Sequence, residues 1–490
     1  MELSLSNVLL SCILLILIWA AFMPKFLQWR SHFSRFKRLV NYIPGPVPLP
    51  LLGNVLPLTM GPQNKFLKTM GEFNNQYRPC FRLWIGPLMG TVHISSWKYA
   101  EEIFNSNVHI EKSSTYQFLN SWLGTGLLTS TGAKWHSRRK LLTPAFHRSV
   151  LDNFQEVFVE KSHILVKKLL PKCQEGKVFD IAPFIWQSSL DIICETAMGT
   201  KMEIQEKLSK EDAAYLQAIS GAAEITLHRF MRPWIHSDFI FNLTPTGRKF
   251  NQYVKTMHEF TDKVISSKKA EYLKSKIQAT SEQKDEDDGL NLKKRKAFID
   301  ILIDASFGDS HENKPLLSDL DIREEVDTFM FEGHDTTASG ISWSLYLLGR
   351  HAEIQESLRL YPSVPMIARK IRQDVKLGDY TVPAESEVVI HMFFAHRDPE
   401  VFPEPNKYNP DNFLPENCNK RPAYAFVPFS AGSRNCIGQK FAMQEAKTVV
   451  ATVLQNYRVE AVDAPEDLIL LSELILRSEK GINLRLYPRK

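Results

Sequence analysis

Cysteine is scarce in this chain of 490 residues, and the few cysteines lack the spacing of a paired or metal-binding set. The six lie far apart, at positions 12, 80, 173, 194, 418 and 436. This spacing indicates neither a disulfide framework nor a structural zinc site. We therefore expect the catalytic part of the chain to reside in a reducing compartment.

An excess of charge of one sign is also lacking, since 60 Lys and Arg residues face 55 Asp and Glu, a net charge of +5. Such a small excess predicts no nucleic-acid role, although a local basic patch could still dock an acidic protein partner. The chain has no internal repeat and no glycine motif that would bind a dinucleotide. With 44% hydrophobic residues, we expect one large domain with an ample core.

Residues 3–23 are apolar except for Ser, Asn and one Cys and carry no charge, and their length of about twenty residues is enough to span a bilayer. Basic residues follow it (Lys25, Arg30, Arg35, Lys37 and Arg38). A cleaved signal peptide is the alternative, but it would carry its positive charge before the apolar run. We therefore predict an uncleaved anchor at residues 1–24, with the rest of the chain on the cytosolic side.

Four prolines interrupt residues 43–54. They exclude a helix there and favour a stiff, extended segment. Residues 25–54 then form a basic and proline-rich hinge, and residues 55–490 form the catalytic domain.

The stretch 429–438 is the most informative part of the chain. Cys436 lies in a turn between Gly432 and Gly438, and an apolar pattern with helical spacing follows from Phe441 to Val453. A helix N-terminus favours a thiolate over a thiol, and glycines allow a large flat ligand to approach the backbone. The alternative is that Cys436 is a small buried hydrophobe, as we expect for the other five cysteines.

The pattern Phe-x-x-Gly-x-Arg-x-Cys-x-Gly resembles the haem-binding signature of the cytochrome P450 superfamily, with its fixed positions at Phe429, Gly432, Arg434, Cys436 and Gly438. The resemblance implies a mainly α fold with small β-sheets, behind an N-terminal transmembrane helix. It implies a haem whose iron takes an axial thiolate from Cys436 and is thereby prepared for O–O cleavage. The implied reaction inserts one oxygen atom into an apolar substrate and releases the other as water.

Two further positions could reach an anionic group. Trp135 and Arg139 are four residues apart, so they share one face of a helix. The alternative is an ordinary amphipathic helix with a buried tryptophan. The resemblance implies that both hold a haem propionate, and that Arg369 and Arg434 also neutralise propionates.

Residues 319–348 read as a long helix, with Phe331-Glu-Gly-His-Asp-Thr-Thr337 in its middle. Glycine, aspartate and threonine are poor choices for a buried helix, and such local conflicts often mark function. The segment resembles the family's acid–threonine pair, in which Asp335 relays protons and the Thr336 hydroxyl faces oxygen. The alternative is a helix kinked at Gly333 with solvated polar groups.

The complete motif resembles the branch that hydroxylates fatty acids at the chain end, together with its insect relatives, which also oxidise hormones and xenobiotics. In some of that branch the glutamate equivalent to Glu332 forms an ester to a haem methyl. An ester at Glu332 is therefore one alternative for this chain.

Glu356 and Arg359 resemble the Glu-x-x-Arg pair that braces the thiolate side of the haem. The family usually adds an arginine where this chain has Asn412, so we predict a lock that is weaker or built differently. Relatives also carry a few tens of residues between the long helix and the equivalent of Glu356, and these are missing here. An unbroken helix would separate Glu332 from Glu356 by roughly 36 Å, so we predict a bend at residues 349–351.

We interpret this gap as an internal deletion, by exon skipping or an imperfect gene model, and a haem-deficient or non-catalytic isoform is the alternative function. The resemblance otherwise implies electrons from NADPH through a separate reductase, with cytochrome b5 as a further partner. It implies an endoplasmic reticulum (microsomal) location and a role in lipid metabolism. A peroxide-rearranging enzyme without external electrons is a third alternative, which the Asp335–Thr336 pair disfavours. The charged residues 275–296 should form a solvated loop.

Overall fold

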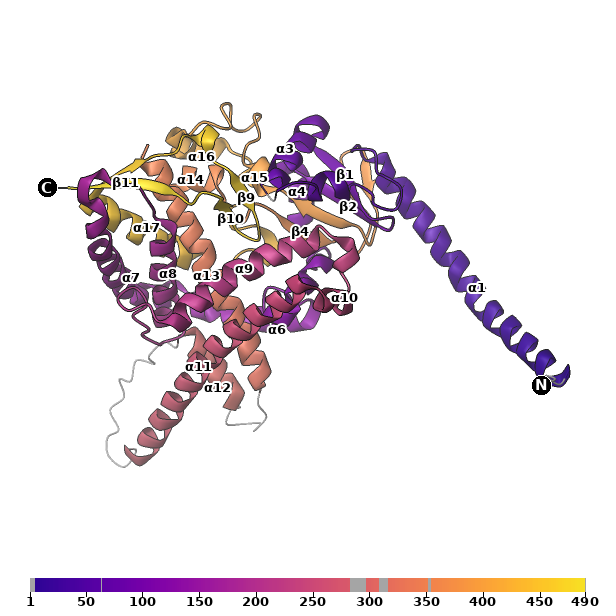
Figure 1. Ribbon diagram of the computed structural model, residues 1–490, viewed down its shortest axis with the longest axis horizontal. Coiled ribbons are helices and arrows are strands. Elements are labelled where there is room, and N and C mark those ends of the chain that lie inside the picture. The colour runs from indigo at the N-terminus through magenta and orange to yellow at the C-terminus, as the bar shows by residue number, and fades with distance from the viewer. Residues whose placement is uncertain (1–4, 63, 283–296, 308–315, 351–353, 490) are drawn as a thin grey trace.

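The computed structural model describes residues 5–62, 64–282, 297–307, 316–350 and 354–489. Figure 1 shows a broad, mainly helical domain with small sheets and one long helix projecting from it, which confirms the predicted mainly α fold with small β-sheets. The helices are α1 Leu5–Tyr42, α2 Val55–Thr59, α3 Lys65–Tyr77, α4 Trp97–Phe104, α5 Asn120–Leu123, α6 Gly132–Leu142, α7 Arg148–Leu169, α8 Ala182–Thr196, α9 Lys210–Phe230, α10 Asp238–Leu243, α11 Pro245–Glu282, α12 Phe298–Phe307, α13 Asp319–Leu348, α14 Ile354–Leu360, α15 Met392–Ala395, α16 Pro415–Lys420 and α17 Gln439–Asn456.

The strands form four small sheets. In the four-stranded sheet the order is β1-β2-β7-β4, and only β2 and β7 run parallel. The strands are β1 Cys80–Ile85, β2 Met89–Ile94, β3 Phe179–Asp180, β4 Ile367–Lys370, β5 Val375–Leu377, β6 Tyr380–Val382, β7 Glu387–Ile390, β8 Tyr457–Ala461, β9 Leu470–Ser472, β10 Leu476–Ser478 and β11 Asn483–Pro488. The remaining sheets pair β10 with β9, β5 with β6, and β11 with both β3 and β8.

The N-terminal helix α1 extends further than the sequence predicts. It includes Pro24 and continues to Tyr42, so residues 25–42 are helical and only the proline-rich residues 43–54 are free of helix. Of the helices in the described residues, none combines the length and apolar character that crossing a membrane requires. A second correction concerns residues 275–296: α11 continues through Glu282, and the rest of that expected loop lies outside the described residues.

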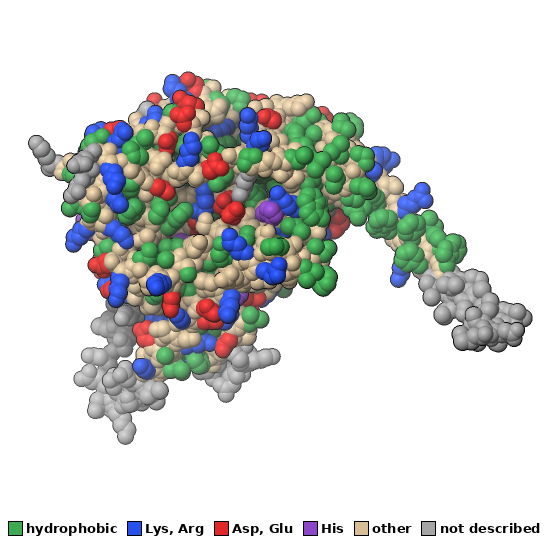
Figure 2. Space-filling view, in the orientation of Figure 1, with side chains coloured by type: hydrophobic (Ala, Val, Ile, Leu, Met, Phe, Trp, Pro, Cys, Tyr) green, Lys and Arg blue, Asp and Glu red, His purple; other side chains and the backbone are tan. Residues whose placement is uncertain are grey.

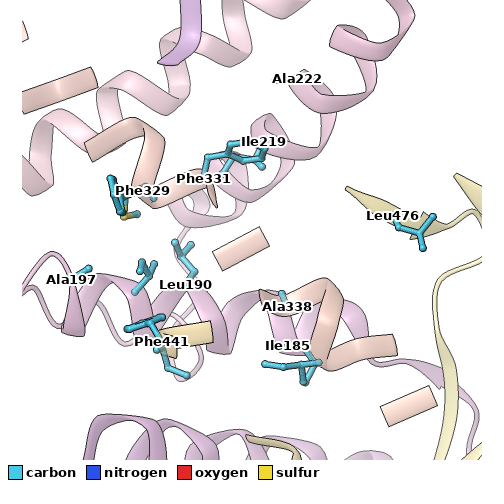
Figure 3. Close-up of a cluster of buried hydrophobic side chains, with 14 of the residues drawn as sticks. Ile185, Leu190, Ala197, Ile219, Ala222, Phe329, Phe331, Ala338, Phe441 and Leu476 are labelled. Atoms are coloured by element: carbon cyan, nitrogen blue, oxygen red, sulfur yellow. The ribbon is translucent and has the colours of Figure 1, made fainter. Parts of the chain in front are cut away.

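Helix α13 is the centre of the domain. The Ser318 hydroxyl accepts from the Asp321 N–H while the Asp321 carboxylate accepts from the Ser318 N–H, a capping box that fixes the start of the helix. Most of its side chains are buried. Figure 3 shows Phe329, Phe331 and Ala338 of α13 within an apolar cluster whose other labelled members come from α8 and the residue after it, α9, α17 and β10.

Gly333 explains why a poor helix former occupies the middle of α13. A Cβ atom at this position would lie 2.7 Å from Cδ1 of Ile193 on α8, so a larger residue would have to displace that side chain. The helix runs without interruption through this point. The glycine therefore serves close packing of α8 on α13 rather than a break in the helix.

Helix α17 carries a buried acid. Glu445 is fully buried and accepts a hydrogen bond from the Ser189 hydroxyl of α8 at 2.7 Å. Burial raises the pKa of Glu445 to about 8. The folded protein therefore keeps this proton at pH values at which the unfolded chain releases it, and stability falls as pH rises from the usual glutamate range to about 8.

We expect Glu445→Gln to remove part of this pH dependence. The amide keeps the acceptor for Ser189 without burying a charge, so the variant should melt higher than the parent protein above pH 8 and similarly near pH 5. Melting temperatures from pH 5 to 9 test this, with exposed Glu156→Gln on α7 as the matched control. Equal slopes for all three proteins would contradict it.

Candidate haem site

Cys436 lies in the loop between the short helix η6 (Gly432–Arg434) and α17. The Cys436 N–H donates to the Phe429 oxygen at 2.9 Å, which closes the loop. Gly432 has a φ of +70°, and a Cβ there would lie 2.0 Å from the Phe104 oxygen of α4, so this position requires glycine. The loop presents Cys436, Phe429 and Gly438 to one large cavity.

The thiol of Cys436 is open to that cavity but surrounded by protein. Burial, followed by the Glu332 carboxylate, raises the pKa of the Cys436 thiol to about 11, although the Gly438 N–H and the Arg139 guanidinium act in the opposite direction. The Gly438 N–H thus favours the thiolate, but burial outweighs it. A bound metal ion would have to supply the missing positive charge, because coordination deprotonates a thiol.

Basic side chains gather at the same cavity. Arg139 donates to the Asn435 backbone oxygen at 2.9 Å and to its Oδ1 at 2.7 Å. Arg434 donates to the backbone oxygens of Leu128 and Ser130 and lies over the Trp135 ring at 4.6 Å.

Two more cations complete the group. Lys112 lines the cavity, and its backbone forms an isolated β-bridge with that of Arg369 in β4. Arg369 is buried and does not itself line the cavity. Burial and repulsion from Arg369 and Arg434 hold the pKa of Lys112 well below its usual range. The sequence did not single out Lys112, which no motif marks.

Within the described part of the chain, none of these four cations forms an ion pair with a carboxylate; the nearest acid is Glu332 on the cavity wall. Buried charges are normally paired. The cavity therefore fits a flat ligand with carboxylates of its own, facing the open Cys436. Haem with its two propionates has this chemistry, so the residues present fit the predicted cofactor.

Helix α13 supplies the opposite wall. Glu332, Gly333, Thr336 and Thr337 line the cavity, and the Thr336 hydroxyl donates to the Glu332 backbone oxygen at 2.5 Å. Asp335 also belongs to α13, but its side chain does not line the cavity and is 1% exposed. Nη2 of Arg477 contacts its two carboxylate oxygens at 2.8 and 2.7 Å. The structure thus brings Thr336 to the cavity but separates it from Asp335.

The predicted bracing pair lies in α14. Arg359 donates from Nε to Oε2 of Glu356 at 2.9 Å, and both residues are 0% exposed. The remaining guanidinium N–H groups of Arg359 donate to backbone oxygens of His396, Pro405 and Lys407. His396 in turn accepts from the Val427 N–H at 2.9 Å, which connects the brace to the segment just before the Cys436 loop.

Asn412 keeps only part of the role of the usual arginine. Its amide donates weakly to the Glu356 carboxylate, at 3.3 and 3.4 Å. Arg421 supplies a positive charge beside Asn412, because it donates to the Asn412 backbone oxygen. Its guanidinium also lies over the rings of Phe413 at 4.3 Å and Phe402 at 5.4 Å. The contacts of Asn412 with Glu356 are thus long, and Arg421 supplies the charge beside them.

We expect Arg421→Met to destabilise the protein by about 1–3 kcal/mol, because it removes a charged hydrogen bond and contacts with several rings. A thermal or denaturant melt measures this loss. Lys420→Met is the matched control, since Lys420 is exposed and adjacent in sequence. A melt of Arg421→Met that coincides with that of Lys420→Met would rule out the bracing contribution.

The bend before the brace is also present. Helix α13 ends at Leu348, and α14 begins as a separate helix at Ile354, so the long helix does not run through. Gly349 approaches β8 so closely that a Cβ would lie 2.7 Å from the Ala461 nitrogen. Of the predicted bend residues, His351 lies outside the described part of the chain.

Comparison with known proteins identifies the family. The family model for cytochrome P450 matches residues 43–358 and 352–486, two stretches that meet where the sequence predicts missing residues. Cytochrome P450 4c3 of Drosophila melanogaster is 42% identical over 93% of this chain and 91% of its own length. Cytochrome P450 4c21 of Blattella germanica and cytochrome P450 4V2 of Homo sapiens are each 40% identical, over 92% and 90% of this chain and 94% and 88% of their own lengths.

The alignment with the Drosophila relative is consistent with a gap in this chain. It extends over 496 residues, more than the chain possesses, although it includes only 93% of the chain. Some of its positions therefore have no residue here. With the family model covering most of the sequence and these relatives similar over nearly their full length, the chain belongs to the cytochrome P450 family of haem-thiolate monooxygenases.

Proposed function

We propose that this monooxygenase hydroxylates fatty acids or similarly long apolar molecules, with hormones and xenobiotics as the wider substrate class. The observation that carries this is the cavity itself. Its apolar lining extends from Phe441 of α17, beside Cys436, to Phe66 and Met70 of α3, elements that lie far apart in Figure 1. Such a lining suits an extended hydrocarbon chain with one end at the site of reaction.

The proposed roles follow the positions of the side chains. Cys436 would hold the haem iron between Phe429 and Gly438, and Trp135, Arg139, Arg369 and Arg434, joined by Lys112, would bind the propionates. The bound haem supplies oxygen activation. The Thr336 hydroxyl would donate a hydrogen bond to the oxygen side. Asp335, whose side chain does not line the cavity, would be the acid partner that the family resemblance implies, and an ester at Glu332 remains an alternative for its carboxylate.

Cytochromes P450 take electrons from a redox partner. We assign this role to an NADPH-dependent reductase, with cytochrome b5 as a second donor. We place the enzyme at the endoplasmic reticulum membrane, with residues 1–24 as anchor, 25–54 as hinge and 55–490 as cytosolic catalytic domain. Figure 2 supports a membrane-facing side: hydrophobic side chains gather where α1 joins the domain, and exposed apolar residues there include Val47, Leu49, Leu51, Met60 and Leu88.

The test has two stages, both on the full chain. The reduced, carbon-monoxide-bound protein should show the strongly red-shifted Soret band of a haem thiolate. Turnover of a series of fatty acids should then require both NADPH and reductase. A band at the shorter wavelength, or no bound haem, would favour the haem-deficient isoform, and turnover without reductase would favour the peroxide-rearranging class.

A further inference from the structure

The turn between β9 and β10 places an acid on the otherwise mainly apolar wall of the cavity. Glu473, Leu474 and Ile475 of this turn all line it, and Glu473 is 7% exposed. The Nε atom of Arg477 lies 3.3 Å from Oε2 of Glu473. The same guanidinium binds Asp335 of α13 through Nη2. Arg477 therefore connects Glu473, which lines the cavity, with Asp335, which does not.

This cluster contains one cation for two carboxylates. Arg477 is only 10% exposed and lies over the Trp186 ring at 4.6 Å. Two ionised carboxylates would leave a buried negative charge, which low-dielectric surroundings disfavour. This arrangement favours a proton on one of the two acids near neutral pH.

The surroundings single out Glu473 as that acid. The charged groups that act on it are Arg477 of β10, Glu224 of α9 and Asp335 of α13. Burial, together with Glu224 and Asp335, raises the pKa of Glu473 to about 7 even though Arg477 acts in the opposite direction. Asp335, in contrast, has both carboxylate oxygens bound by Arg477.

Neither member of the acid–threonine pair is placed to bring a proton from solvent into the cavity. The Asp335 side chain does not line the cavity, and the Thr336 hydroxyl already donates to the Glu332 backbone oxygen. Glu473 does face the cavity. We propose that Glu473 is a second proton donor of this monooxygenase, which passes protons into the cavity that Thr336 also lines, while Arg477 couples its charge to Asp335.

The step balances without any further reactant. The O–H bond of Glu473 breaks, the proton passes to a water molecule in the cavity, and Arg477 stabilises the carboxylate that remains. Solvent then restores the proton. While Glu473 is ionised, Arg477 is shared between two carboxylates, which weakens its hold on Asp335. This inference rests on the monooxygenase activity and does not depend on which substrate is hydroxylated.

The test compares the intact holoenzyme with Glu473→Gln and, as control, Glu224→Gln, which removes a nearby charge of the same sign outside the cavity. Infrared pH titrations are compared as differences from the parent enzyme, because other buried acids such as Glu445 lose a proton in a similar pH range. The parent should show a carboxylic acid C=O band of Glu473 that disappears near neutral pH. Glu473→Gln should lack the band. Glu224→Gln should keep it but shift its midpoint to lower pH.

Coupling gives the functional readout. In the parent enzyme, product formed per NADPH consumed should fall as pH rises through neutrality; in Glu473→Gln it should be about tenfold or more lower and flat over that range. A band that persists in Glu473→Gln, or unchanged coupling with an unchanged pH profile, would overturn the proposal. If Glu473→Gln fails to fold, Glu473→Asp replaces it: a band at a changed midpoint supports the assignment, and an unmoved band refutes it. The infrared band needs no substrate, so failure to hydroxylate fatty acids would leave this assignment tested.

Discussion

Replacing Cys436 by serine should abolish the red-shifted Soret band of the reduced carbon-monoxide complex and all detectable reductase-supported turnover. A serine hydroxyl is a harder and far less acidic ligand than a thiol and cannot take over the role of a thiolate. The cavity makes this loss more severe. Burial raises the pKa of the Cys436 thiol to about 11, so the surroundings would resist ionisation of a less acidic serine even more strongly.

Cys173→Ser is the matched control. Cys173 is also a free, partly buried cysteine, and its Sγ donates to the Leu169 backbone oxygen at 3.4 Å, an interaction that serine can keep. It should retain the parent spectrum and haem content. A red-shifted band that survives in Cys436→Ser would show that another side chain ligates the iron, and the proposed roles of the whole 429–438 loop would fail with it.

The motif residues could be predicted because each belongs to a short local pattern. The 429–438 loop, the Trp135–Arg139 helix face and the Glu356–Arg359 pair depend on contacts over a few residues. The structure accordingly places Trp135, Arg139 and Arg434 around Cys436.

The residues that the sequence did not reveal depend on contacts across the fold. Arg477 meets Asp335 over a separation of 142 residues, and Lys112 meets Arg369 through an isolated bridge. Nothing in the local sequence of Arg477 or Lys112 distinguishes either residue from an ordinary surface cation. Residues 275–282 were misassigned for a different reason: low apolar content was taken to indicate a loop, but lysine, glutamine and alanine are good helix formers and extend α11.

The second large effect is expected at the brace, where Glu356→Ala should cost about 3–5 kcal/mol of stability and most of the bound haem. Both partners are fully buried, and removing one carboxylate leaves the Arg359 charge uncompensated in the interior. The loss should reach the Cys436 loop, because Arg359 also donates to the His396 oxygen and His396 accepts from Val427.

Two further variants separate charge from geometry. Arg359→Lys keeps the positive charge but loses the planar fork that reaches the Pro405 and Lys407 oxygens, so it should be intermediate. Glu404→Ala breaks the exposed pair with Lys407 and should cost no more than about 1 kcal/mol. Denaturant melts and haem-to-protein ratios measure all three.

The brace matters more here than its geometry alone suggests, because α14 begins within a few residues of the end of α13. Helix α14 has only seven residues, so the buried ion pair must contribute much of its anchorage. Parent-like stability and haem content in Glu356→Ala would show that α14 keeps its place without the pair. The anchorage would then belong to Arg421 and its aromatic cluster, and Arg421→Met should become the more damaging substitution of the two.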